Sequence, residues 1–168
     1  MTSTQAELRS AIVAEARRWI GTPFHHRQRQ FGRGVDCINL LVAVYSAVGL
    51  IPAIELPWYP PDWALHRSSE LIVETLKLYA RPVQRALAGD VAVYGFGRCV
   101  SHAAIIEDDD HVIHAYIKAE RVERTERSIL QERLASAWTA NRSPEAQISG
   151  YWSVFAPGAC AAQEMIAA

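Results

Sequence analysis

Cys37 is the best-placed nucleophile in this sequence, because it begins an apolar segment with the pattern of a buried helix. The segment covers residues 37–48 and is preceded by Asp36, a good N-cap, and followed by Gly49. Free backbone N–H groups and the helix dipole favour an anion at such a position. The pattern therefore predicts a thiol pKa below its usual value of about 8.5. It also predicts N–H groups that can hold an oxyanion. The alternative is a structural cysteine in the core.

Two histidines, His102 and His114, flank an acidic turn at residues 107–110. In an antiparallel hairpin centred near Asp108 they would be directly opposed on one face, with Cβ atoms about 4.5–5.5 Å apart. One imidazole can then accept the thiol proton while the other orients it, as in a catalytic triad. The alternative is a pair of ordinary half-buried histidines.

A zinc site competes with this interpretation, because Cys99, His102, His111 and His114 have spacing that resembles ligand spacing. Residues three apart on a strand point to opposite faces, which argues against a shared ion. We therefore expect chemistry without a metal or an organic cofactor.

A basic loop precedes Cys37 and contains His25, His26, Arg27, Arg29 and Arg33. It is either a solvated loop or a cationic rim for substrate carboxylates. The residues proposed to bind substrate are His25, His26, Asp36 and Ser101. The aromatic pair Trp58 and Tyr59 either walls a groove or packs on the sheet.

The elements that must position these residues form an α+β pattern. Helices are expected after the capping box of Thr4 and Glu7, at residues 37–48, at 68–79, and at 128–138 with a second capping box, Ser128 with Gln131. Strands are expected at residues 91–94, 100–106, 112–116, 121–125 and 150–155. Helices first and strands later predict an antiparallel sheet packed against the buried helix that carries Cys37.

Length and composition predict one domain over residues 1–168, with a core at 5–156 and a tail at 157–168. The net charge of −1 gives no basic footprint for nucleic acid. Three cysteines do not form a disulfide framework. No segment reads as a signal peptide or a membrane span, so we expect synthesis in the cytoplasm.

Three segments, GTPFHHRQRQFGRGVDCINLL, AGDVAVYGFG and SHAAIIEDDDHVIHAY, resemble the NlpC/p60 cysteine peptidases. The resemblance is closer to the subgroup found with phage tails and gene-transfer agents. It implies a papain-like fold with Cys37 as nucleophile, His102 as base and His114 as the third polar residue. It also implies hydrolysis of peptidoglycan stem peptides, often between D-glutamate and a diamino acid. A phage particle with tail-tip partners would deliver the enzyme to the wall.

The sequence departs from this family in two places. Ile38 and Asn39 follow the nucleophile where Ser-Gly is common, and Phe24 stands where many members have a tyrosine near the oxyanion site. These departures keep two alternatives open. One is a structural tail component with weak catalysis, and the other is a related cysteine amidase or acyltransferase.

Overall fold

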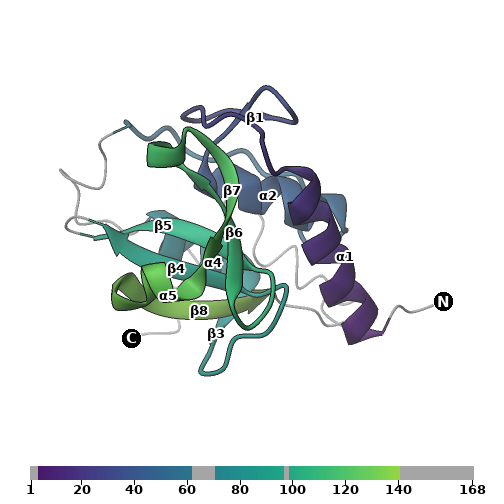
Figure 1. Ribbon diagram of the computed structural model, residues 1–168. Coiled ribbons are helices and arrows are strands. Elements are labelled where there is room, and N and C mark those ends of the chain that lie inside the picture. Colours follow the sequence, from purple (N-terminus) through teal and green to yellow (C-terminus); the bar gives the residue numbers. More distant parts are fainter. Residues whose placement is uncertain (1–3, 62–70, 97–98, 141–168) are drawn as a thin grey trace, which may run out of the picture.

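The computed structural model describes residues 4–61, 71–96 and 99–140 (Figure 1). Its main feature is an antiparallel sheet of six described strands in the order β3-β8-β4-β5-β6-β7. The strands are β3 (Ala80–Val83), β4 (Val91–Phe96), β5 (Cys99–Ile106), β6 (His111–Tyr116), β7 (Arg121–Glu126) and β8 (Leu134–Ala140). The strands expected from sequence between residues 91 and 125 are confirmed, with bounds extended by one or two residues.

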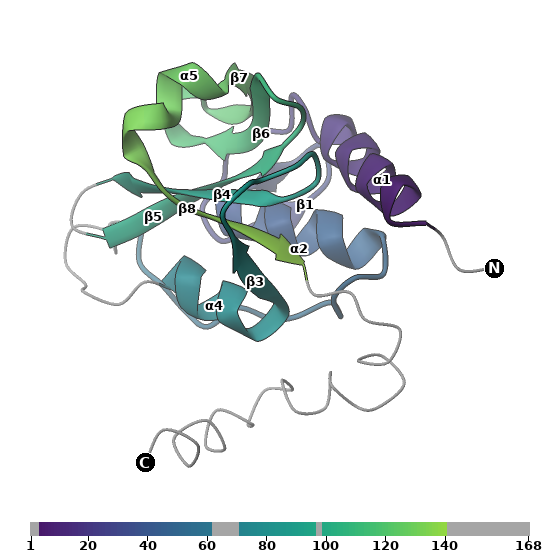
Figure 2. The same ribbon diagram turned by 90° about the horizontal axis from the view of Figure 1, so that it is seen from below.

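Helices cover both faces of this sheet. On one face lie α1 (Gln5–Arg18), α2 (Cys37–Ala47) and α4 (Leu71–Tyr79). On the other face lie α5 (Arg127–Leu130) and the 3-10 turn η2 (Gln131–Arg133). Figure 2 shows α2 and α4 on one side of the central strands and α5 on the other. The expected α+β architecture, with the Cys37 helix packed on an antiparallel sheet, is confirmed.

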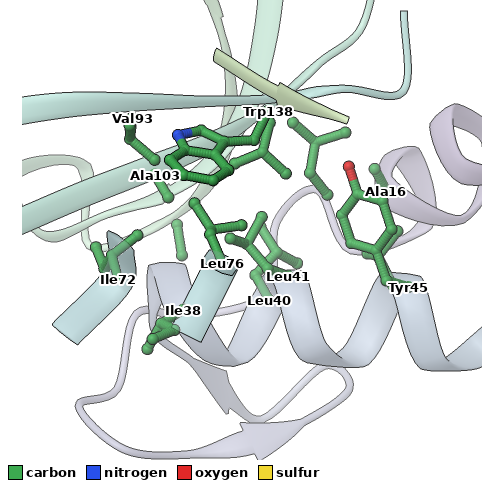
Figure 3. Packing of buried hydrophobic residues seen from close by; sticks show 14 of the residues in the cluster. Ala16, Ile38, Leu40, Leu41, Tyr45, Ile72, Leu76, Val93, Ala103 and Trp138 are labelled. Carbon is green, nitrogen blue, oxygen red and sulfur yellow. The ribbon is translucent and has the colours of Figure 1, made fainter. Parts of the chain in front are cut away.

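The main core lies between the sheet and the helices α1, α2 and α4. Figure 3 shows Leu40 and Leu41 of α2 packed with Leu76 of α4 and Trp138 of β8. All four side chains are buried. Burying one such side chain contributes roughly 1.5–3 kcal/mol. This packing fixes the axis of α2, and with it the place of Cys37 at the helix start.

Helix α1 begins at the predicted capping box and is anchored to the sheet by an ion pair. The Thr4 side chain accepts from the backbone N–H of Glu7, and the Glu7 carboxylate accepts from the backbone N–H of Thr4. Arg9 then reaches across to the sheet, where it pairs with the buried Asp90 at 2.8 Å. The capping box predicted from the T-x-x-E pattern is confirmed.

The helix predicted at residues 128–138 is wrong. Only Arg127–Leu130 is α-helical, its N-cap is Glu126 without a side-chain bond, and Leu134–Ala140 forms β8. Strand β8 lies between β3 and β4, and it buries Trp138 in the core. Pairing on both sides and burial of the indole outweigh the local helix signal. The partner strand β3 was also not predicted.

The segment before Cys37 forms two very short strands, β1 (Arg29–Gln30) and β2 (Gly34–Val35), where the sequence indicated only a loop. Upstream of them, residues 21–24 run along β7. Gly21 N–H donates to the Val122 carbonyl, Val122 N–H donates to the Thr22 carbonyl, and Phe24 N–H donates to the Glu120 carbonyl. The chain that leads to the nucleophile is thereby fixed to the edge of the sheet.

Other predictions fall outside the described residues. These are the start of the helix at 68–79, the strand at 150–155 and the tail at 157–168. None of the described helices has the length and apolar character that crossing a membrane requires.

Candidate active site

Cys37 is the first residue of α2, and Asp36 is its N-cap. The Asp36 carboxylate accepts from the backbone N–H of Asn39 at 3.0 Å, which holds the first turn closed. The half-buried Cys37 lines a cleft of about 180 Å³ together with His102 of β5. The thiol also accepts from the backbone N–H of Ala103, the residue after His102. The start of α2 and the middle of β5 therefore meet at this cleft.

The thiol of Cys37 is protonated at neutral pH. Burial, and then the negative charge of Asp36, raise the pKa of Cys37 to about 12, although backbone N–H groups of Ala103, Ile38 and Cys37 act in the opposite direction. The lowered thiol pKa predicted from the helix start is wrong, because loss of hydration outweighs the helix N-terminus. Such a thiol needs a base at the moment it attacks.

His102 is adjacent to a second imidazole. Its Nε2 atom lies 2.6 Å from Nδ1 of His114, and both rings are buried. Burial and the neighbouring His114 lower the pKa of His102 to about 3, and burial lowers the pKa of His114 to about 4. Both rings are therefore neutral at physiological pH, so one ring nitrogen of His102 carries a free lone pair.

The two histidines meet through a register that differs from the expected one. Ile105 pairs with Ile113 and Ile106 with Val112. Continuing this register places His114 opposite Ala104, so the direct pairing of the histidines predicted from the turn is wrong. A shift of two residues keeps a side chain on the same face. The rings consequently still approach each other, as diagonal neighbours.

The hydrogen bonds continue from His114 into β7. Nε2 of His114 lies 2.9 Å from Oγ1 of Thr125, and Thr125 donates to a carboxylate oxygen of Glu123 at 3.2 Å. The same Glu123 oxygen lies 3.8 Å from Nε2 of His114. A polar chain therefore runs from the cleft through both histidines to β7.

A second polar cluster surrounds Asp36. The Tyr59 hydroxyl donates to Oδ2 of Asp36 at 2.6 Å and accepts from the Asn39 amide at 3.1 Å. Burial and Asp36 raise the pKa of Tyr59. The Tyr59 ring also lines the cleft and packs edge-on against His26. Asn39, which departs from the family pattern, thus has two buried partners that suit an amide.

The four residues proposed to bind substrate have different positions. His26 and Ser101 line the cleft, although the Ser101 hydroxyl donates to the Phe96 carbonyl at 2.7 Å. Asp36 also lines it, but its oxygens already accept from Asn39, Tyr59 and the Arg27 backbone N–H. His25 is exposed and is not part of the cleft lining.

Arg27 and Arg29 of the basic loop do not form a cationic rim, which was one of the two interpretations of this loop. Arg29 pairs with Glu55 and donates to the Ile54 carbonyl, and the Arg27 guanidinium lies over the exposed Trp58 ring. The positive charge that lines the cleft belongs to Lys118, in the 3-10 turn η1 (Ile117–Ala119). This residue was not predicted, because nothing in its local sequence marks it as lying near Cys37.

The four residues of the zinc alternative are not gathered. Within the described ranges, the group of close potential ligands is instead Glu107, Asp108 and His111. Its members are held in ion pairs, with Arg17 and Arg124 on Glu107 and Arg124 on Asp108. We interpret this group as an ion-pair network at the hairpin turn.

Thr125 and Glu123 were also missed at the sequence level. Both lie on a predicted strand at alternate positions, so they share a face. The signal available was their distance from the tight turn at 117–120. Counting back across that turn brings Glu123 opposite His114, which is the observed register.

No family model matches the sequence, and no curated protein matches it. Solved structures do match. The NlpC/p60 domain of the peptidoglycan hydrolase SagA is 25% identical with a TM-score of 0.53, over 78% of this chain and 97% of that chain.

Two further structures extend the comparison. An NLP/P60 family protein similar to a lipoprotein, from Staphylococcus aureus, is 20% identical with a TM-score of 0.60, over 84% of this chain and 44% of that chain. RipD from Mycobacterium tuberculosis is a non-catalytic NlpC/p60 domain protein adapted to peptidoglycan binding. It is 17% identical with a TM-score of 0.53, over 82% of this chain and 98% of that chain. The resemblance of the sequence motifs to NlpC/p60 proteins is thus confirmed, and the chain has the NlpC/p60 fold.

Proposed function

We propose that this protein is a cysteine peptidase that hydrolyses the stem peptides of peptidoglycan. The observation that carries the proposal is the position of Cys37 at a helix start, in the same cleft as His102, whose Nε2 atom is bonded to His114 at 2.6 Å. The similar NlpC/p60 structures support a wall substrate. Within that class, we propose a bond between D-glutamate and a diamino acid.

The mechanism begins with a neutral thiol and a neutral imidazole. As Sγ of Cys37 attacks the amide carbonyl, His102 takes the thiol proton. The N–H groups of Cys37 and Ile38 at the helix start hold the oxyanion. His102 then gives its proton to the leaving amine, which leaves a thioester on Cys37. Water, deprotonated by His102, hydrolyses the thioester and restores the thiol.

The cleft wall supports a peptide substrate that carries a carboxylate. Aromatic rings of Phe24, Tyr59 and Phe96 line it, and Lys118 adds one positive charge. Lys118 has no ion-pair partner among the described residues. A stem peptide offers both apolar methyl groups and free carboxylates to such a surface.

The test is digestion of purified muropeptides followed by mass spectrometry. The wild-type protein should release cleaved stem fragments, and Cys37→Ala should release none while keeping its circular dichroism spectrum. Full activity in Cys37→Ala would end the proposal. His114→Gln should retain the fold and lose most of the rate.

A peptidoglycan-binding protein without hydrolysis is the second candidate. The protonated thiol of Cys37 and the non-catalytic RipD structure favour it. In that case the wild-type protein would sediment with purified sacculi as strongly as Cys37→Ala, and neither would release fragments. Screening labelled acyl substrates beside the muropeptides separates a cysteine amidase or acyltransferase from both.

The route to the wall is a further part of the proposal. The sequence resemblance to phage-tail and gene-transfer-agent proteins supports transport by a particle. An antibody against this protein should then label one end of purified particles from the source cell. Its presence only in the soluble fraction of cells that release such particles would contradict this route.

A further inference from the structure

We infer that Thr125 and Glu123 are positioning residues that fix the tautomers of both histidines, leaving Nδ1 of His102 unprotonated for Cys37. The chemical consequence of this arrangement rests on the proposed cysteine peptidase function. The tautomers themselves do not depend on it.

The register of β6 and β7 places both residues beside His114. His114 is directly opposite Glu123, and Val112, two residues earlier on the same face, is opposite Thr125. Thr125 and Glu123 therefore approach the same ring from adjacent positions. Their oxygens lie 2.9 Å and 3.8 Å from Nε2 of His114.

The direction of the hydrogen bonds follows from the acceptor at the end of the chain. A carboxylate only accepts, whereas a hydroxyl has one proton and spare lone pairs. Thr125 gives its proton to Glu123 at 3.2 Å, so its oxygen is left to accept from His114. The Glu123 charge near Nε2 also favours an N–H there over a lone pair.

The proton positions on both rings follow from this direction of hydrogen bonding. With its proton on Nε2, the neutral His114 has a lone pair on Nδ1, which accepts from Nε2 of His102 at 2.6 Å. The proton of the neutral His102 is thereby placed on Nε2. Its Nδ1 atom carries the lone pair that can accept the Cys37 proton.

The opposite tautomers would disable the base. If Thr125 donated to His114, Nδ1 of His114 would carry the proton and donate to His102. The proton of His102 would then sit on Nδ1, where a base needs a lone pair. Aromatic packing does not choose between these states, because Tyr116 stacks on His114 with its ring centre 5.1 Å away in either case.

The test is a long-range proton–nitrogen NMR spectrum of protein labelled with ¹⁵N-histidine, recorded at pH 7.5. His114 signals are identified by their loss in His114→Gln, and His102 signals by their loss in His102→Gln. Protonated Nε2 and unprotonated Nδ1 in both rings support the inference. Protonated Nδ1 in either ring overturns it.

Thr125→Val and Glu123→Gln then test the two positioning residues. Each should shift His114 and His102 toward a mixture of tautomers, and each should lower kcat on muropeptides at least about tenfold with KM within about twofold. The matched control is Thr139→Val, a buried threonine on β8 whose hydroxyl accepts from Arg9. It should leave the tautomers and kcat unchanged.

The outcomes separate this inference from the proposed function. Unchanged histidine tautomers in both Thr125→Val and Glu123→Gln overturn it, whatever the activity. If Thr125→Val does not fold, Glu123→Gln decides alone, because its side chain is 29% exposed and tolerates the change. If wild type cleaves no wall peptide, the NMR arms still give their answer, and only the proposed function fails.

Discussion

The hydroxyl of Tyr59 lies 2.6 Å from a carboxylate oxygen of Asp36, the residue directly before Cys37. Asp36 raises the pKa of the Cys37 thiol, because its charge opposes a thiolate beside it. The hydrogen bond that Tyr59 donates delocalises part of the negative charge of Asp36. Tyr59, in the segment after α2, therefore affects the electrostatic environment of Cys37 as well as its packing.

Removing this hydroxyl should slow the chemistry of Cys37. Tyr59→Phe keeps the ring but leaves Asp36 with more of its charge, so alkylation of Cys37 by iodoacetamide at pH 8 should slow about threefold. The rate is read by peptide mass spectrometry. Tyr45 lies on α2, the helix that begins with Cys37, and its buried hydroxyl donates to the Gly89 carbonyl. Tyr45→Phe removes this hydrogen bond and should not change the alkylation rate. Equal slowing in both variants would contradict the role of Tyr59.

The buried histidines should make the fold acid-sensitive. Their pKa values, about 3 for His102 and about 4 for His114, lie below the ordinary 6.5. In acid, the unfolded chain therefore binds protons at these two histidines that the folded protein does not bind. The contribution of the two histidines to the free energy of unfolding is present above about pH 6.5 and is lost as the pH drops toward 4. At pH 5 the loss is about 2 kcal/mol for each ring.

Urea unfolding at pH 8 and at pH 5 measures this loss. His114→Gln should be less stable at pH 8 but should lose less stability on going to pH 5. An equal loss in the variant and the wild type would show that other groups cause the acid sensitivity.

The ion pair between Arg9 and Asp90 should contribute far more to the free energy of unfolding than the ion pairs on the surface. Asp90 is buried, and it also accepts from the Leu87 N–H at 2.8 Å. Asp90→Ala should lower the free energy of unfolding by about 3 kcal/mol, because Arg9 and the Leu87 N–H lose their partner. Arg18→Ala removes an exposed guanidinium that pairs with Glu15 within α1, and it should cost less than about 0.5 kcal/mol. Urea unfolding of both variants makes the comparison.

Lys118 should bind a substrate carboxylate. Lys118→Glu should raise KM for muropeptides about tenfold and change kcat by less than about twofold, because it removes attraction that is equal in ground and transition states. Lys77→Glu makes the same charge change on α4, outside the cleft lining. An equal rise of KM in both variants would indicate a general charge effect.

Features that depend on neighbouring residues could be predicted from the sequence. The capping box of α1 and the N-cap of α2 are formed by side chains within three residues of their partners, so their pattern is visible in the chain. The shared face of His102 and His114 was also predicted, and it survives because the actual register differs from the expected one by two residues, an even number.

Features that depend on distant partners were not predictable in the same way. Strand β8 is defined by β3 and β4 on either side, and alone its residues read as a helix. Burial of Cys37 by the sheet reversed the expected direction of its thiol pKa. Tyr59 reaches the cleft from an irregular segment and Lys118 from the 3-10 turn η1, and no local rule determines the course of either.

The backbone bonds between residues 21–24 and 120–122 join the two walls of the cleft into one piece. Phe24 ends one segment of this seam and His26 follows it, whereas Ile117 and Lys118 lie just before the other segment. A ligand cannot push these walls apart without breaking main-chain hydrogen bonds. Selection by size should consequently act at the entrance, before any closing movement, and bulky cross-linked material would be turned away by fit alone.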